Sequence, residues 1–545
     1  MKEKAALIAI LLTVSMIAMM ILPAGAWEYY KTTRANPQTD NNVELFGPRA
    51  EGAYARTLVV PVGYATIQEA INAANPGDTI YVMDGIYHEH VVVNKTVSLL
   101  GEKRETTIVD GSGVGTVVEV TADDVNVSGF AIRNSGVPIP EVWPPDCGIL
   151  LYYSDRSTIT NCIITSNGGH GFCFVTSRYY TISNSIVSSN KYIGIAVGDT
   201  GSSNGAIRNN TVYLNGRAGI EAYWGSDDTI VEGNTVYSNL MGIVIGWSDH
   251  CMIRDNRLHN NTASVLLDTT SHCTVLNNRI SHKQGIVLLG LGNYFNNILN
   301  NTVRFGECGI SLGASARYTT ISGNVISGNE YGLTIGRNQG YPNYDNYIYH
   351  NDFIDNVANA RNDEDRYTNV WDDGYPSGGN YWSDYTGGDE KRGPNQDQPG
   401  SDGIGDTPYK ICGDAGSKDH YPVMKPWVTI IAKIDAKPDT LNLKSEGKWI
   451  TVYIELPKGC NVANINVSSI LLNETISAQP KPVAIGDYDM DGVPDLMVKF
   501  DRAEVINYIL SAAGKRTKFS QVTLTITGKL KNGTRFEGSD IIKKR

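Results

Sequence analysis

Hydrophobic residues recur along the middle of the chain in a short, repeated pattern. A glycine followed by alternating hydrophobic positions appears at Gly148-Ile149-Leu150-Leu151, and eight further copies follow at steps of 21 to 25 residues. In each period one more short β-run precedes an asparagine and another follows it. Three short strands per period leave no room for a helix. This repetition predicts a solenoid in which each coil covers its neighbour's hydrophobic face. The copies begin at Gly148, Gly171, Gly194, Gly219, Gly242, Ser264, Gly285, Gly309 and Gly332.

Stacked coils would place equivalent residues directly above one another. Parallel strands about 4.8 Å apart make the inward positions a column, here Ile195, Ile220, Ile243, Val265, Ile286 and Ile310. We expect the asparagine at each corner to adopt the left-handed conformation and to bond the next turn's backbone. Leucine-rich repeat proteins have a similar period, but this sequence lacks their regularly spaced leucines and the helical segment of each repeat. The asparagines assigned to one register are Asn161, Asn184, Asn210, Asn234, Asn256, Asn278, Asn301 and Asn324.

These motifs resemble the right-handed parallel β-helix of the pectin-lyase-like superfamily, and in particular its NosD-like branch with carbohydrate-binding and sugar-hydrolase repeats. The segment 65–74 is predicted to be an amphipathic helix, and with 76–87 it resembles the cap and first coil of that superfamily. The resemblance implies a β-helix over residues 58–361. It does not fix an activity, because the superfamily holds lyases, hydrolases, epimerases and non-enzymes.

Two further regions follow the repeat. Residues 362–427 are rich in Gly, Asp, Tyr and Trp, and they resemble the ending of NosD-like repeats in archaeal surface proteins. We expect an ordered cap on the β-helix; a flexible linker is the alternative. Residues 428–545 show longer alternating strands, which predict an antiparallel β-sandwich with a short helix near Asp501–Leu510. The fold class is therefore all-β.

Composition and the N-terminus indicate an exported protein. The 545 residues are 41% hydrophobic and carry a net charge of −11 without a Lys/Arg stripe, which argues against nucleic-acid binding. Lysines, an apolar run and a small-residue site predict a cleaved signal peptide over 1–26 and a linker over 27–57; a retained anchor is the alternative. We expect a secreted or cell-surface protein, with envelope attachment and oligomeric state left open. Glycosylation sequons lie at Asn94, Asn126, Asn209, Asn260, Asn300, Asn466, Asn473 and Asn532.

An acidic loop in the C-terminal region predicts a structural Ca²⁺ site. Asp487, Asp489, Asp491 and Asp495 occupy positions 1, 3, 5 and 9 of a loop with Gly492 at position 6. Oxygen ligands around a glycine turn suit Ca²⁺. Position 12 is not an acid, so a further ligand has to come from elsewhere, and a solvated acidic turn is the alternative. A weaker second candidate is formed by Asn395, Asp397, Asp402 and Asp406.

Two His-Cys pairs lie one coil apart, at His250-Cys251 and His272-Cys273. NosD-like proteins are associated with copper-enzyme maturation, so the resemblance makes a copper site conceivable. Neighbouring residues on a strand point to opposite faces, however, and we expect inward cysteines and outward histidines instead. A disulfide between the two cysteines is a further alternative.

Aromatic and acidic residues cluster five residues after the repeat glycine. Tyr153, Trp224 and Trp247, with Tyr223 beside them, are candidates for carbohydrate binding, because aromatic platforms flanked by polar groups suit sugars. Glycoside cleavage needs two carboxylates about 5–9.5 Å apart. Adjacent coils could place Glu221 near Asp199 or Asp249.

The hypothesis from sequence is an exported β-helix protein that binds extracellular or cell-wall polysaccharide. The alternatives are a polysaccharide lyase, glycoside hydrolase or uronate epimerase, and a NosD-like factor in copper-enzyme maturation.

Overall fold

The computed structural model describes residues 55–139, 144–198, 201–281, 283–338, 340–427, 430–443, 447–457, 460–473, 475–513, 520–531 and 535–544. The chain divides into a solenoid unit, Met1–Met424, and a C-terminal unit, Lys425–Arg545. The predicted signal peptide, most of the predicted linker, Asp199 and Asn532 lie outside the described residues. Within the described residues, no helix is long and apolar enough to cross a membrane.

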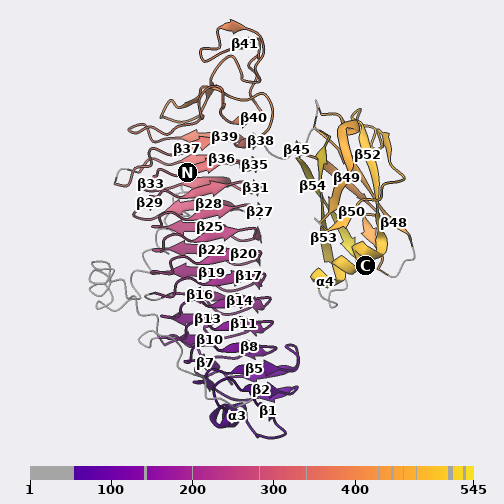
Figure 1. Ribbon diagram of the computed structural model, residues 1–545. Helices are drawn as coiled ribbons and strands as arrows, with labels where there is room; N and C mark the ends of the chain where they lie inside the picture. Colours follow the sequence, from indigo (N-terminus) through magenta and orange to yellow (C-terminus); the bar gives the residue numbers. More distant parts are fainter. Residues whose placement is uncertain are drawn as a thin grey trace. The chain divides into compact units, whose positions relative to one another are not determined.

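The solenoid unit consists of coils whose strands form three long parallel sheets, here named A, B and C in chain order (Figure 1). In the described part of the chain, sheets A and B have thirteen strands each and sheet C has twelve.

Sheet A contains β1 (Thr57–Val60), β2 (Thr79–Val82), β5 (Ser98–Gly101), β8 (Asn126–Ser128), β11 (Thr158–Thr160), β14 (Thr181–Ser183), β17 (Ala206–Arg208), β20 (Ile230–Glu232), β23 (Met252–Arg254), β26 (Thr274–Leu276), β30 (Asn297–Leu299), β34 (Thr320–Ser322) and β37 (Tyr347–Tyr349). Sheet B contains β3 (Gly85–Tyr87), β6 (Thr107–Asp110), β9 (Ala131–Arg133), β12 (Ile163–Thr165), β15 (Ile186–Ser188), β18 (Thr211–Tyr213), β21 (Thr235–Tyr237), β24 (Arg257–His259), β27 (Arg279–Ser281), β31 (Thr302–Arg304), β35 (Val325–Ser327), β38 (Asp352–Ile354) and β40 (Tyr381–Trp382). Sheet C contains β4 (Val91–Val93), β7 (Val118–Val120), β10 (Cys147–Tyr152), β13 (His170–Val175), β16 (Ile195–Val197), β19 (Ala218–Tyr223), β22 (Met241–Gly246), β25 (Ala263–Asp268), β28 (Gln284–Leu289), β32 (Cys308–Leu312), β36 (Tyr331–Ile335) and β39 (Ala358–Asn362). Short pairs are formed by β29 (Asn293–Tyr294) with β33 (Ala316–Arg317), β41 (Lys391–Arg392) with β42 (Gln398–Pro399), and β43 (Tyr409–Lys410) with β44 (Lys418–Asp419).

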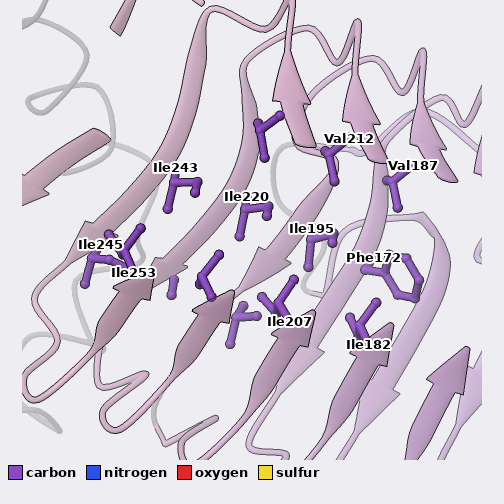
Figure 2. Close-up of a cluster of buried hydrophobic side chains, with 14 of the residues drawn as sticks. Phe172, Ile182, Val187, Ile195, Ile207, Val212, Ile220, Ile243, Ile245 and Ile253 are labelled. Carbon is purple, nitrogen blue, oxygen red and sulfur yellow. The ribbon is translucent and has the colours of Figure 1, made fainter. Parts of the chain in front are cut away.

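The predicted hydrophobic column is confirmed. Ile220 is in register with Ile195 on one side and with Ile243 on the other. The column continues through Val265, Ile286 and Ile310. Figure 2 shows Ile195, Ile220 and Ile243 of this column on successive coils in the interior. Because each coil covers the next, the stack forms one continuous buried core.

The assignment of all the corner asparagines to one register is wrong. Strand pairing aligns Ile186 with Thr211, so Asn210 is equivalent to Ser185 and not to Asn184. Two neighbouring positions are therefore distinct. The first takes a positive φ, as in Asn161 (52°) and Asn184 (52°). The second is buried and forms an amide ladder, in which Asn210 Nδ2 donates to Asn234 Oδ1 at 3.1 Å and each later asparagine repeats the bond. The ladder runs through Asn210, Asn234, Asn256, Asn278, Asn301, Asn324, Asn351 and Asn380.

Both ends of the core are closed by other structure. The predicted helix is present as α3 (Ile67–Ala73), whose N-cap Thr66 accepts a bond from Glu69 N and whose Ile67, Ala70 and Ile71 are buried. At the other end Trp382 stacks between Phe353 and Tyr409, with ring centroids 4.4 and 4.1 Å away. An exposed solenoid edge would invite pairing with other chains, and these groups prevent it.

The C-terminal unit has two sheets and one apolar cluster drawn from both. Its helix, α4 (Arg502–Ala513), lies close to the predicted position, and a 3₁₀ turn, η1, spans Val462–Asn464. Within the described residues, one sheet contains β45 (Ile430–Ile431), β54 (Arg535–Lys544), β53 (Ser520–Leu530), β49 (Ile465–Leu472) and β50 (Ile476–Ser477), with β47 (Thr440–Leu441) beside β54, and the other contains β46 (Lys433–Lys437), β48 (Trp449–Glu455), β52 (Asp495–Asp501) and β51 (Ala484–Gly486).

Candidate functional site on the outer face of sheet C

Glu221 projects from the outer face of sheet C. Strand β19 alternates, with Ile220 and Ala222 in the core and Glu221 on the opposite face. Its Oε2 lies 3.3 Å from Arg217 Nη2 and makes no hydrogen bond. The residue is 8% exposed. The pKa of the Glu221 carboxyl is raised, chiefly by burial. The charge of Arg217 opposes this rise, and the charge of Asp268 adds to it. Burial of this kind disfavours the charged form of a carboxyl.

Tyr223 reaches across two coils to Asp268. Its hydroxyl donates a 2.6 Å hydrogen bond to Asp268 Oδ2. Tyr223, Gly246 and Asp268 share one register position in three successive coils. The ring lies over Gly246, where a Cβ would overlap it. Burial raises the pKa of Asp268, while the bonds from Tyr223 and Thr269 lower it. The site therefore holds two carboxyl groups with raised pKa on one face.

Asp268 was not predicted from the sequence, although a signal for it exists. It falls two coils after Tyr223 in the same repeat position. Adjacent-coil periodicity does not reveal this pair, because the coil next to Tyr223 carries Gly246 at that position.

The predicted aromatic residues divide into two groups. Trp224 and Trp247 stack on one another, with ring centroids 5.1 Å apart and planes 18° from parallel. Tyr223 meets Trp224 edge to face at 5.5 Å. Tyr153 is exposed but lies three coils earlier, beside Tyr152. Three of the four predicted aromatic residues, Tyr223, Trp224 and Trp247, are therefore in contact with one another. Tyr223 is the buried member of this group.

The same face carries an apolar row that is separate from the core. It alternates with the core positions of sheet C and packs against Tyr223, Trp224 and Trp247. Its strand residues include Met241, Val244, Leu266 and Val287.

Arg217 is the basic group that contacts Glu221. His170 lies on the outer row of sheet C, and its pKa is lowered to about 4 by burial first and then by the Arg217 charge. His170 is therefore a neutral ring at neutral pH, and Arg217 supplies the positive charge.

The other predicted catalytic candidates do not join Glu221. Asp249 Oδ1 accepts bonds from the backbone N–H and hydroxyl of Ser271, at 2.9 and 3.0 Å, on the turn that follows sheet C. Asp199 lies outside the described residues.

The His-Cys pairs adopt the alternating arrangement expected from strand geometry. Cys251 and Cys273 are buried in the core. His250 and His272 are exposed, and their rings stack at 5.1 Å. The thiols and imidazoles lie on opposite sides of the backbone and do not converge on one point. The eight cysteines, all of them in the described residues, are free.

The acidic loop brings its carboxylates together. Among the described residues, Asp487, Asp489 and Asp495 form one group with the spacing of metal ligands, and Glu455, Asp489 and Asp491 form another. Glu455, on β48, was not predicted, since only strand pairing places it opposite Asp495. Lys433 Nζ lies 2.7 Å from both Asp489 Oδ2 and Asp491 Oδ2, and 2.8 Å from Glu455 Oε2.

The second acidic candidate is a turn whose carboxylates bind their own loop. Asp402 Oδ2 accepts from Gly393 N at 3.2 Å, and Asp406 accepts from Glu390 N and Lys391 N. Asn395 and Asp397 are exposed.

Comparisons with known proteins agree with the fold. Residues 215–387 match the family model described as periplasmic copper-binding protein (NosD). Residues 66–236 and 108–280 match the right-handed β-helix region. No curated protein matches the chain closely enough to count as a relative.

Several solved structures are similar to this chain. The A-module of the Azotobacter vinelandii mannuronan C-5 epimerase AlgE6 is 17% identical, with TM-score 0.39, over 54% of this chain and 90% of that one. The catalytic unit of a GH87 α-1,3-glucanase from Streptomyces thermodiastaticus is 14% identical, with TM-score 0.42, over 61% and 66%. PfbA, a surface adhesin of Streptococcus pneumoniae, is 14% identical, with TM-score 0.41, over 56% and 87%. The solenoid of this chain is a right-handed parallel β-helix whose sequence matches the NosD family model over residues 215–387.

Proposed function

We propose that this protein binds polysaccharide outside the cytoplasm, on the outer face of sheet C. The observation that carries the proposal is the strip formed by Glu221, Tyr223 and Asp268 beside the stacked indoles of Trp224 and Trp247. Sugar sites combine apolar and aromatic surface with a few polar groups that fix orientation. The half-buried rings of Trp224 and Trp247 supply contact area for a sugar, and the carboxyl groups beside them supply polar partners.

The location outside the cytoplasm has two supports. The matching family model describes a periplasmic protein, and the N-terminal sequence predicts an export signal. N-terminal sequencing of the mature protein from an expressing cell would test the cleavage, which we place after Ala26.

Glycan binding by the full-length protein tests the proposal directly. We expect at least one neutral or acidic glycan in a panel to bind in calorimetry, and Trp224→Ala/Trp247→Ala to weaken that binding about tenfold or more. Phe305→Ala is the matched control, because Phe305 is an exposed aromatic on another turn. A tryptophan variant that binds every glycan as tightly as the wild type would refute the assignment to this face.

A polysaccharide-active enzyme is the second candidate. Glu221 and Asp268 both have raised pKa values, and a protonated carboxyl is what leaving-group protonation requires. Unsaturated ends would indicate a lyase, new reducing ends a hydrolase, and solvent exchange at C5 an epimerase. We expect Glu221→Gln to abolish such a product while glycan affinity stays within about threefold.

Copper binding is the third candidate, favoured by the NosD family match across both histidines. The stacked imidazoles of His250 and His272 are the exposed ligands available there, and their cysteine neighbours face the core. Copper titration of the wild type against His250→Ala/His272→Ala tests this candidate. The same copper stoichiometry in the wild type and the variant would eliminate copper binding at these histidines.

We also propose a Ca²⁺ site at the acidic loop of the C-terminal unit. Glu455 supplies a carboxylate that the loop lacks at position 12, and Gly492 takes the left-handed φ of 87° that the turn needs. An EDTA-induced drop in melting temperature that persists unchanged in Asp489→Ala/Asp491→Ala would remove the assignment.

A further inference from the structure

The turn between sheets C and A carries a short parallel pair of its own, formed by β29 and β33 (Figure 1). In each strand the first residue is buried, so Tyr294 and Arg317 project outward from successive coils. A single bridge aligns Tyr344, on the next coil, with Arg317. The arginine therefore lies in the middle of a column in which both neighbours are tyrosines.

The guanidinium of Arg317 lies between these two tyrosine rings. Its central carbon is 5.4 Å from the ring centroid of Tyr294 and 4.7 Å from that of Tyr344. Both distances fall within the range of cation–π attraction, which extends to about 6 Å. The rings hold the charged group in place, but they are no substitute for the oxygen acceptors that its in-plane N–H donors bind.

The charge of Arg317 has no ion-pair partner in the part of the chain that the structure describes. Its Nε is buried and forms no hydrogen bond with the described residues. Asp345, an acid on the next coil, interacts with the hydroxyl of Tyr318. Arg337, one coil after Arg317, is paired, because its Nη1 lies 3.3 Å from Asp365 Oδ2. The structure thus fixes Arg317 between rings without satisfying its charge.

A row of stacked rings runs beside this column. His272, Phe295 and Tyr318 lie on three successive coils, with ring centroids 5.2 and 4.9 Å apart and planes 21° and 10° from parallel. All three side chains are exposed. The rings follow the coil spacing of about 4.8 Å, which is close to the length that one pyranose adds to an extended polysaccharide. The row therefore gives the charged column an apolar border that repeats at the spacing of a sugar chain.

We propose that Arg317 binds the acidic group of an anionic polysaccharide, with neighbouring sugar residues against the ring row of His272, Phe295 and Tyr318. Guanidinium groups bind carboxylates and sulfates through charge-assisted hydrogen bonds. Exposed aromatic side chains supply the apolar contact that sugar rings need. This turn shares no residue with the strip on the outer face of sheet C, and the proposal stands independently of the function assigned there.

Dextran sulfate and dextran provide a matched test, because the two polymers share a backbone and differ in charge. We expect the full-length protein to bind dextran sulfate in calorimetry, more weakly as NaCl is raised, and to bind dextran at least tenfold less tightly. Polymannuronate in place of dextran sulfate distinguishes carboxylate from sulfate recognition. Binding of either acidic polymer supports the proposal, and failure of both overturns it.

Single substitutions assign the binding to this arginine. We expect Arg317→Gln to lose about tenfold or more in affinity for the acidic polymer. Arg317→Lys should fall between Arg317→Gln and the wild type, because lysine keeps the charge without the planar set of donors. Arg337→Gln is the matched control. It removes one positive charge from the following coil, but that charge is already paired with Asp365, so binding should stay normal.

Further measurements separate lost binding from lost folding and from binding elsewhere. Arg317→Gln should melt within about 2–4 °C of the wild type, because a cation–π contact at a partly exposed site is weak. Trp224→Ala/Trp247→Ala should bind the acidic polymer normally. Wild-type affinity in Arg317→Gln would overturn the proposal, and so would a loss confined to the tryptophan variant. Polyuridylate bound as tightly as dextran sulfate would also overturn it, by showing a general polyanion surface.

Discussion

Tyr223 and Asp268 are joined by a 2.6 Å hydrogen bond that spans two coils of the β-helix. The bond exists because the coil between them carries Gly246 at the same position, and the tyrosine ring lies over that glycine. A side chain at the middle coil would block the tyrosine from its partner. The polar groups of the candidate site therefore depend on one missing Cβ.

Replacing Gly246 by alanine should disrupt this contact. The added methyl would overlap the Tyr223 ring, and we expect the displacement to cost about 1–3 kcal/mol of stability and to weaken glycan binding. Gly336→Ala is the control. It lies in the same column of sheet C, and a Cβ there meets nothing closer than 3.7 Å. Calorimetric melting temperatures and glycan titrations measure both effects. Equal melting temperatures for the two variants would contradict the role given to Gly246.

The asparagine ladder should be far less tolerant than the asparagines beside it. Asn301 Oδ1 accepts from the backbone N–H and from the Nδ2 of Asn278, at 2.9 and 3.0 Å. In Asn301→Ala the buried backbone N–H of Asn278 would lose its acceptor, and the carbonyls of Val275 and Leu299 would lose the Asn301 amide as a donor. We expect a loss of about 2–5 kcal/mol. Asn277→Ala changes an exposed corner with φ of 56° and should cost only about 1 kcal/mol. Chemical denaturation of both variants checks the order. A smaller loss at Asn301 than at Asn277 would show that the ladder is not stabilising.

Asp419 closes the ladder and should make stability fall with pH. It is fully buried and accepts bonds from Asn380 N at 2.7 Å and Trp382 Nε1 at 2.8 Å. The pKa of Asp419 is raised to about 7, chiefly by burial. The hydrogen bonds from Asn380 and Trp382 act against this rise, and the charge of Asp372 adds to it. The folded state thus favours the protonated acid. Its stabilising contribution is complete below about pH 4, where the unfolded chain also holds the proton, and is lost as pH rises to about 7.

The measurement is the melting temperature of the solenoid unit between pH 4 and 8. Relative to the wild type, we expect Asp419→Asn, which cannot ionise, to gain about 3 kcal/mol of stability over this range. The opposite contribution of His170 and His259, whose pKa values are lowered to about 4, is common to both proteins. Asp397→Asn, at an exposed position of the same cap, should retain the wild-type slope. Parallel profiles for wild type and Asp419→Asn would disprove this titration.

Lys433 should compete with Ca²⁺ at the acidic loop. Its ammonium contacts Glu455, Asp489 and Asp491. The hydrogen bonds that it donates to Asp489 and Asp491, and then to Glu455, raise the pKa of the lysine. A metal ion needs these same oxygens. We expect Lys433→Met to bind Ca²⁺ about tenfold more tightly than wild type in calorimetry, and Glu455→Gln to bind it more weakly.

Lys437→Met is the matched control for Ca²⁺ binding. Lys437 lies on the same strand but pairs with Asp435 and Asp439. Its loss should leave Ca²⁺ affinity unchanged. Unaltered affinity in Lys433→Met would mean that the lysine does not occupy the ligand position.

The β-helix could be predicted from the repeat alone, because a period of 21 to 25 residues makes each coil repeat the contacts of the one before it. It placed Ile220 against Ile243 and put the cysteines inward and the histidines outward, since these follow from register and strand alternation alone.

Only the tertiary structure separated the two asparagine positions. They are neighbours in sequence and asparagine suits both, one for its left-handed φ and the other for its buried amide. The tertiary structure also revealed contacts between residues that are not equivalent positions on adjacent coils. Tyr223 skips a coil to reach Asp268, and Glu455 meets the acidic loop from another strand. Periodicity relates each residue to its equivalent one coil away, whereas side-chain length and a missing Cβ decide which more distant groups touch.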